Sequence, residues 1–139
     1  MKKILIIGGI IIVLFGGSVW WSKNLQKNDP DVVARQGIHW HPQLSIFVKG
    51  EKQEVSPNIG ITGGKMGSIH THEPDGTIHF EYEGVVSKDD VRLKKFFEIW
   101  NKDINSFGQN VKMTVNGEEN TELGDYPIRD GDKIELRYE

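Results

Sequence analysis

The chain has 139 residues, of which 37% are hydrophobic and 27% are charged, and this size predicts one small domain with a modest core. Cysteine is absent, which excludes disulfides, thiolate metal sites and thiol nucleophiles. The formal net charge is −3, which argues against nucleic acid as a partner because phosphate binding needs a basic face.

The first predicted element is a membrane-spanning helix. The uncharged segment ILIIGGIIIVLFGGSVWW, residues 4–21, would be roughly 27 Å long as a helix at ~1.5 Å per residue. Lys2 and Lys3 precede it, and Trp20 and Trp21 close it. We therefore expect a single pass through the cell membrane, with a cytoplasmic N-terminus and an extracytoplasmic remainder. A cleaved signal peptide is the alternative, although no A-x-A cleavage site follows.

Three regions are expected along the chain. Residues 1–22 are predicted to be the transmembrane anchor. Residues 23–37 are polar, contain Pro30 and lack a sustained apolar period, which is typical of a linker with a short helical turn at residues 32–35. The histidine-rich domain is then expected over residues 38–139.

The domain is predicted to begin with one hairpin and to end with two strands. Residues 44–48 and 52–56 flank a Lys-Gly-Glu turn and predict the hairpin. Residues 111–115 predict a strand that runs into an Asn-Gly turn, and residues 133–138 alternate apolar and polar side chains, which predicts a strand with one buried face. The aspartates of the Arg-Asp-Gly-Asp run at 129–132 are interpreted as turn formers rather than calcium ligands.

One amphipathic helix is predicted before the last strands. Ser87 is assigned as its N-cap with Asp90 three residues on, and the pattern ends at Gly108. Its apolar residues recur at helical spacing and are interpreted as core. They are Leu93, Phe96, Phe97, Trp100, Ile104 and Phe107.

The predicted fold class is α+β: a transmembrane helix followed by a small, mainly antiparallel β domain with one amphipathic helix. The order hairpin, helix, strand, strand over residues 67–139 resembles the β-grasp arrangement of ubiquitin-like and sulfur-carrier domains. This likeness is architectural and implies no function.

The segment SIHTHEPDGTIHFEYE, residues 68–83, is predicted to be a second hairpin that sorts its side chains by chemistry. With a tight turn at Pro-Asp-Gly, His72 is expected to face His79, and His70 to face Glu81, with facing Cβ atoms ~5 Å apart. A three-residue loop would instead move His79 off the face of His72. The opposite face is expected to pack against the helix through Ile69, Thr71, Ile78, Phe80 and Tyr82.

A bound metal ion is the preferred interpretation of these histidines. His39 and His41 repeat the pattern around Trp40, so every histidine lies in or beside a His-x-His pair. Adjacent imidazoles repel when protonated, whereas neutral imidazole is a good ligand for Zn²⁺ or Cu²⁺. Glu81 is expected either as a further ligand or as the carboxylate that orients an imidazole. The candidate metal ligands are His39, His41, His70, His72, His79 and Glu81.

Four motifs together resemble a largely uncharacterised family of small, membrane-anchored, His-rich bacterial and archaeal proteins. They are His-x-His at residues 39–41, Asn-Ile-Gly-Ile at 58–61, Ile-His-Thr-His with a turn and Ile-His at 69–79, and Phe-Phe-x-Ile-Trp at 96–100. The resemblance covers about residues 38–107. It implies the same anchored, extracytoplasmic arrangement and brings no established activity.

Three functions remain open from the sequence. The first and preferred one is an extracytoplasmic module that sequesters, delivers or senses zinc or copper, with a metal-transfer or membrane protein as partner. The second is a small zinc-dependent hydrolase or lyase in which Glu81 or Glu73 acts as general base on a His-ligated water. The third is a partner-binding surface domain whose histidines are incidental. The small core leaves little room for a substrate cleft, which weighs against the enzyme.

Overall fold

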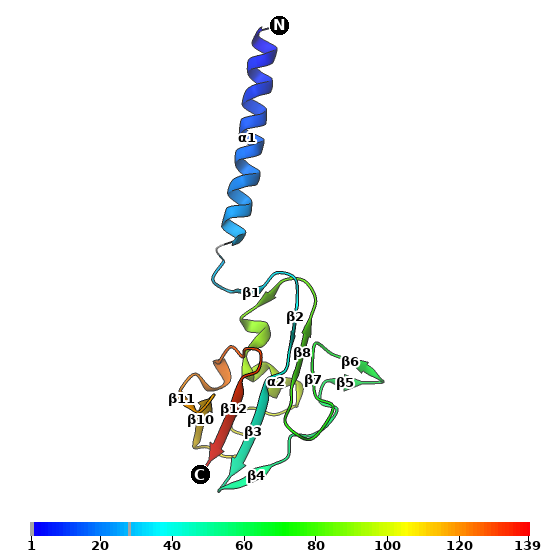
Figure 1. Ribbon diagram of the computed structural model, residues 1–139, viewed down its shortest axis with the longest axis vertical. Coiled ribbons are helices and arrows are strands. Elements are labelled where there is room, and N and C mark those ends of the chain that lie inside the picture. Colours follow the sequence, from blue (N-terminus) through cyan, green and yellow to red (C-terminus); the bar gives the residue numbers. More distant parts are fainter. Residues whose placement is uncertain (1, 28) are drawn as a thin grey trace. The chain divides into compact units, whose positions relative to one another are not determined.

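The computed structural model describes residues 2–27 and 29–139 (Figure 1). The chain divides into two compact units, one that ends at Asp31 and one that spans Val32–Glu139. The first unit is helix α1 (Lys2–Lys27). The large apolar side chains described on this helix are exposed, and they are Ile11, Ile12, Val13, Leu14, Phe15, Val19, Trp20 and Trp21.

The predicted membrane span is contradicted. Within the described residues, no helix has the length and apolar character needed to cross a bilayer. A helix does form where one was expected. What is contradicted is the assignment of this helix as a membrane span. The predicted transmembrane fold and the single-pass, extracytoplasmic localisation are contradicted with it.

The second unit is built on a mixed five-stranded sheet in the order β11-β10-β12-β3-β4. The first predicted hairpin and both predicted late strands are present in it. β12 and β3 pair in parallel at the centre, and a parallel pair requires a crossover, which the chain between them provides. The strands are β3 (Gln43–Val48), β4 (Glu51–Gln53), β10 (Val111–Val115), β11 (Glu118–Asn120) and β12 (Lys133–Tyr138).

The histidine-rich segment forms a second, three-stranded antiparallel sheet in the order β2-β8-β7. Its strands are β2 (Ile38–Trp40), β7 (Ile69–His70) and β8 (His79–Tyr82). The predicted β-grasp-like arrangement over residues 67–139 is therefore wrong in its first hairpin, because residues 43–53 take that place in the main sheet. The chain is α+β overall, with most of its regular structure in sheets.

The amphipathic helix is much shorter than predicted. A 3₁₀ turn (Asp89–Val91) precedes helix α2 (Leu93–Ile99), and the helix stops because Asn101 takes a left-handed φ of 55°. Ser87 does not cap the helix: its backbone N–H and its hydroxyl donate to the Asp90 carboxylate at 2.8 and 2.6 Å. The predicted stripe does pack against the core, with Leu93, Phe96 and Phe97 buried and Trp100, Ile104 and Phe107 half-buried.

Short elements complete the second unit. A strand replaces the helical turn predicted at residues 32–35, and it pairs with the segment that follows β8. A small hairpin lies between β4 and β7. The remaining elements are β1 (Val32–Ala34), β5 (Ile61–Thr62), β6 (Lys65–Met66), β9 (Val86–Ser87) and a 3₁₀ turn (Leu123–Asp125).

One face of the histidine-rich segment is buried in the core, as its alternation predicts. Ile69, Thr71, Ile78 and Phe80 are each 1% exposed or less, and Tyr82 is half-buried with its hydroxyl donating to the Asp90 carbonyl at 3.1 Å. Because side chains alternate across a strand, burial of this face leaves the histidines on the other one.

Candidate metal centre

The register of the histidine hairpin differs from the prediction by two residues. His70 pairs with His79, not with Glu81, and Glu81 pairs instead with His39 on β2. His72 lies beyond the ladder, in the loop after β7. A shift of two residues preserves the face on which each side chain lies, so the imidazoles still gather on one side.

The two arms of the hairpin separate because each bonds to a different part of the domain. The Gly76 carbonyl accepts from the Leu44 amide at 2.8 Å, and the Ile78 amide donates to the Pro42 carbonyl at 2.9 Å. On the other arm, the buried Thr71 is bound to residues 56–59 through both its backbone and its hydroxyl. The ladder therefore ends at His70 and His79 and does not continue to a tight turn.

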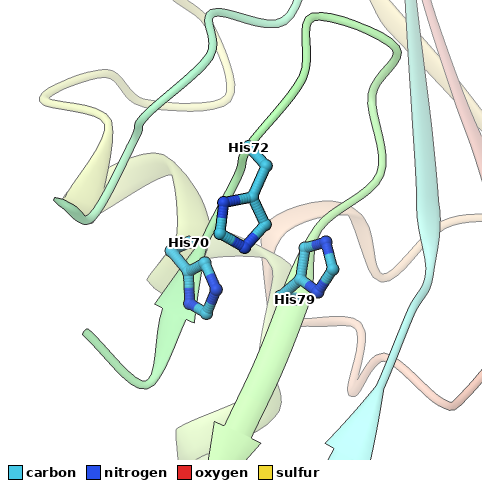
Figure 2. A group of neighbouring side chains, drawn as sticks. All are labelled: His70, His72 and His79. Carbon is cyan, nitrogen blue, oxygen red and sulfur yellow. The ribbon is translucent and has the colours of Figure 1, made fainter. Parts of the chain in front are cut away.

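His70, His72 and His79 form the three-histidine cluster. Each offers a ring nitrogen, and these three nitrogens lie within 4.8 Å of one another (Figure 2). Tetrahedral zinc with bonds of 2.0–2.1 Å needs nitrogens about 3.3 Å apart, so the donors must close by about 1.5 Å at most. His72 is exposed on its loop, so its side chain can change rotamer without displacing core residues.

His70 is fully buried and its free nitrogen is defined. Its Nδ1 lies 2.8 Å from the Gly67 carbonyl, which can only accept, so Nδ1 carries the proton and donates. Nε2 then holds a lone pair, and this buried atom has no hydrogen-bond partner among the described residues. Leaving such an acceptor unpaired costs about 1–3 kcal/mol, and a metal ion at the cluster would remove that cost.

The backbone around Gly67 holds His70 in place. The Gly67 amide donates to the Gly60 carbonyl at 2.9 Å. Gly60 has a φ of 72°, and a Cβ there would lie 2.1 Å from the Ile69 carbonyl oxygen. Sequence reasoning did not find this support, although the glycine-rich run before the histidines was a signal that the backbone approaches another segment closely.

His79 is on β8, and its ring lies between those of His41, His70 and His72. Burial lowers its pKa below the usual value, and the neighbouring His41, His70 and His72 lower it further, while Glu81 acts in the opposite direction. The lowered pKa keeps the His79 ring neutral at pH 7, which is the protonation state that binds a metal.

The other three predicted ligands lie beside the cluster and outside the group of close donors. His39 Nε2 is 3.6 Å from Glu81 Oε1, with both side chains exposed to solvent. The His41 ring is centred 4.7 Å from that of His39 and 4.8 Å from that of His79. An unpredicted contact fixes His41, because its backbone N–H donates to the Asp130 carboxylate at 2.9 Å.

The loop between the hairpin arms contains two further acidic residues, Glu73 and Asp75. Asp75 accepts from the backbone N–H and the hydroxyl of Thr77 at 2.8 and 3.0 Å, and the backbone bond is the main cause of its lowered pKa. Glu73 is exposed in the same loop. Turn chemistry therefore explains Asp75.

Comparison of the chain with family models, curated proteins and solved structures finds no match. The geometry of the histidines is therefore the observation that bears on function.

Proposed function

We propose that the chain is a metal-binding module that holds one zinc or copper ion on His70, His72 and His79, for sequestration, delivery or sensing of the metal. The observation that carries the proposal is the buried Nε2 of His70, which has no hydrogen-bond partner in the described part of the chain and neighbours two other imidazoles. A ring held by a backbone carbonyl at Nδ1 is the usual arrangement of a histidine that ligates through Nε2.

The donor set favours particular ions. Three imidazoles, in a chain without thiolates, suit Zn²⁺ and Cu²⁺, whereas Mg²⁺ and Ca²⁺ prefer oxygen ligands. Between the two, Cu²⁺ binds nitrogen donors more tightly. A three-histidine cluster also leaves a coordination position for water or for a ligand from a second protein, which suits a module that exchanges its ion.

The test is metal binding by the full chain after chelator treatment. We expect tight uptake of one Zn²⁺ or Cu²⁺, measured by equilibrium dialysis with elemental analysis. His70→Asn should lower the affinity at least a hundredfold, because asparagine keeps an N–H for the Gly67 carbonyl and removes Nε2. His72→Gln is a second test at an exposed position where folding is not at risk.

Glu73→Gln is the matched control, since it changes an exposed side chain of the same loop that is not in the three-histidine cluster. It should bind metal like the wild type. Absence of uptake by the wild-type chain, or unchanged affinity in both histidine variants, would refute the proposal.

A further inference from the structure

Four of the five imidazoles form a continuous row that runs from solvent into the core, and the fifth, His72, is exposed beside its inner end. Ring centroids are 4.7 Å apart from His39 to His41, 4.8 Å from His41 to His79, and 5.1 Å from His79 to His70. His72 lies 4.8 Å from both His79 and His70. Exposure falls along the row, from a 65% exposed side chain at His39 to 0% at His70.

A single ion does not account for the whole row. Among the described residues, the group of donors that all lie within 4.8 Å of one another contains His70, His72 and His79, without His39 or His41. β2, which carries His39, and β7, which carries His70, are separated by β8, so the two strands lie roughly 9–10 Å apart at ~4.8 Å per strand spacing. The exposed histidines thus lie next to the three-histidine cluster rather than around the same centre.

The exposed end of the row has its own set of donors. His39, His41 and Glu81, called here the outer subsite, provide two imidazoles and one carboxylate. The carboxylate attracts a cation from solution, whereas the three-histidine cluster has no carboxylate among its donors. Water competes for an ion on these exposed groups, so the outer subsite should bind more weakly than the three-histidine cluster, in which His70 is buried and His79 is half-buried.

We infer that the outer subsite captures the ion and passes it to the three-histidine cluster through His79; the inference rests on the proposed function. His79 is the shared step, because its ring neighbours His41 on one side and both His70 and His72 on the other. Transfer is ligand exchange without redox chemistry. The ion keeps its charge while its bonds to His39, His41 and Glu81 break and bonds to His79, His72 and His70 form.

The test compares rates with affinity in the full chain. Zn²⁺ is supplied from a chromophoric chelator, and loading and the reverse transfer are followed by stopped-flow absorbance. For His39→Gln/His41→Gln we expect loading at least tenfold slower with an affinity within threefold of the wild type. Release must then slow by the same factor, because the ratio of the two rates is the equilibrium constant. Glu81→Gln should slow loading, and Glu83→Gln, an exposed carboxylate two residues on, is the charge-matched control that should not.

The remaining outcomes separate this inference from the proposed function. Unchanged rates in the double variant would overturn the inference and leave the three-histidine cluster intact as a binding site. A fall in affinity that matches the fall in loading rate would overturn it too, because His39 and His41 would then be ligands of the bound ion. If the wild-type chain takes up no metal, the proposed function fails first, before any variant is compared.

Discussion

At His70, one hydrogen bond determines which ring nitrogen is available. The Gly67 carbonyl accepts from Nδ1, so Nε2 is left as the only acceptor on a fully buried ring. Without a metal ion, the unpaired Nε2 lowers the stability of the fold locally. The same atom is already oriented to bind an ion. Such preorganisation reduces the entropy lost when the ion binds.

The pH dependence of stability provides a prediction at His79. Its folded-state pKa is lowered, mainly by burial, so the unfolded chain binds more protons in the window below the ordinary value of 6.5. The free energy of unfolding of the metal-free protein should therefore rise with pH through this window, and the stabilisation should be lost as the pH falls. Urea unfolding between about pH 5 and pH 7.5 measures this dependence.

His79→Gln is the variant for this prediction, because it removes the titrating group and keeps a polar side chain. Its stability should vary less with pH than that of the wild type. Equal slopes for the two proteins would show that burial of His79 does not contribute.

At the scale of elements, the predictable parts were those with a local signal. Alternation in residues 133–138, the Asn-Gly turn after residues 111–115 and the Lys-Gly-Glu turn of the first hairpin predicted four of the five main-sheet strands. The remaining strand, β11, was not predicted. The C-terminal end of helix α2 was predicted too late in the chain. Asn101 stops the helix, whereas the apolar residues continue at helical spacing to Phe107. The histidine register was missed for a different reason: Gly76 and Thr71 are fixed by residues 42–44 and 56–59, and no pattern within the hairpin reports those partners.

The turn before β12 offers a stability prediction. The Asp132 side chain is 5% exposed, and its carboxylate accepts hydrogen bonds from the Tyr126 hydroxyl, the Arg129 amide and the Asn116 side chain. Asp132→Asn replaces one accepting oxygen with a donor that faces other donors. We expect a loss of about 2–3 kcal/mol in the free energy of unfolding, measured by urea denaturation.

Asp130→Asn is the matched control for this variant. It removes the same charge from an exposed side chain and keeps an oxygen that can accept from the His41 amide. Its loss in the free energy of unfolding should be much smaller than that of Asp132→Asn. Similar losses in the two variants would show that net charge, and not the buried hydrogen bonds, accounts for the effect.

On the scale of the whole molecule, the histidine side of the small sheet is supported by the same core as the main sheet. Ile69 and Phe80 on its buried side belong to one hydrophobic cluster with Leu44 and Leu136 of the central strands. The sequence predicted this sorting and included His70, His72 and His79 in one candidate ligand set with His39, His41 and Glu81. It did not predict that His39, His41 and Glu81 would lie apart from that cluster, because their placement depends on how β2 pairs with β8.

Metal binding should stabilise the fold as a whole. An ion at a hundred times its dissociation constant adds about 2.7 kcal/mol to the free energy of unfolding. For a unit of this size, the melting temperature should rise on the order of 10 °C. Differential scanning calorimetry with and without Zn²⁺ measures the change, and His70→Asn should show little of it. A wild-type melting temperature that does not respond to saturating metal would contradict this prediction.

The loop that carries His72 is fixed at both ends. Thr71 is buried at its start, and Gly76 at its end is bound to Leu44 so closely that a Cβ would lie 2.1 Å from the Leu44 carbonyl oxygen. Only residues 72–75 lie exposed between these two points. Any backbone adjustment that brings His72 to an ion is therefore limited to these residues, and the rest of the domain takes no part in its entropic cost.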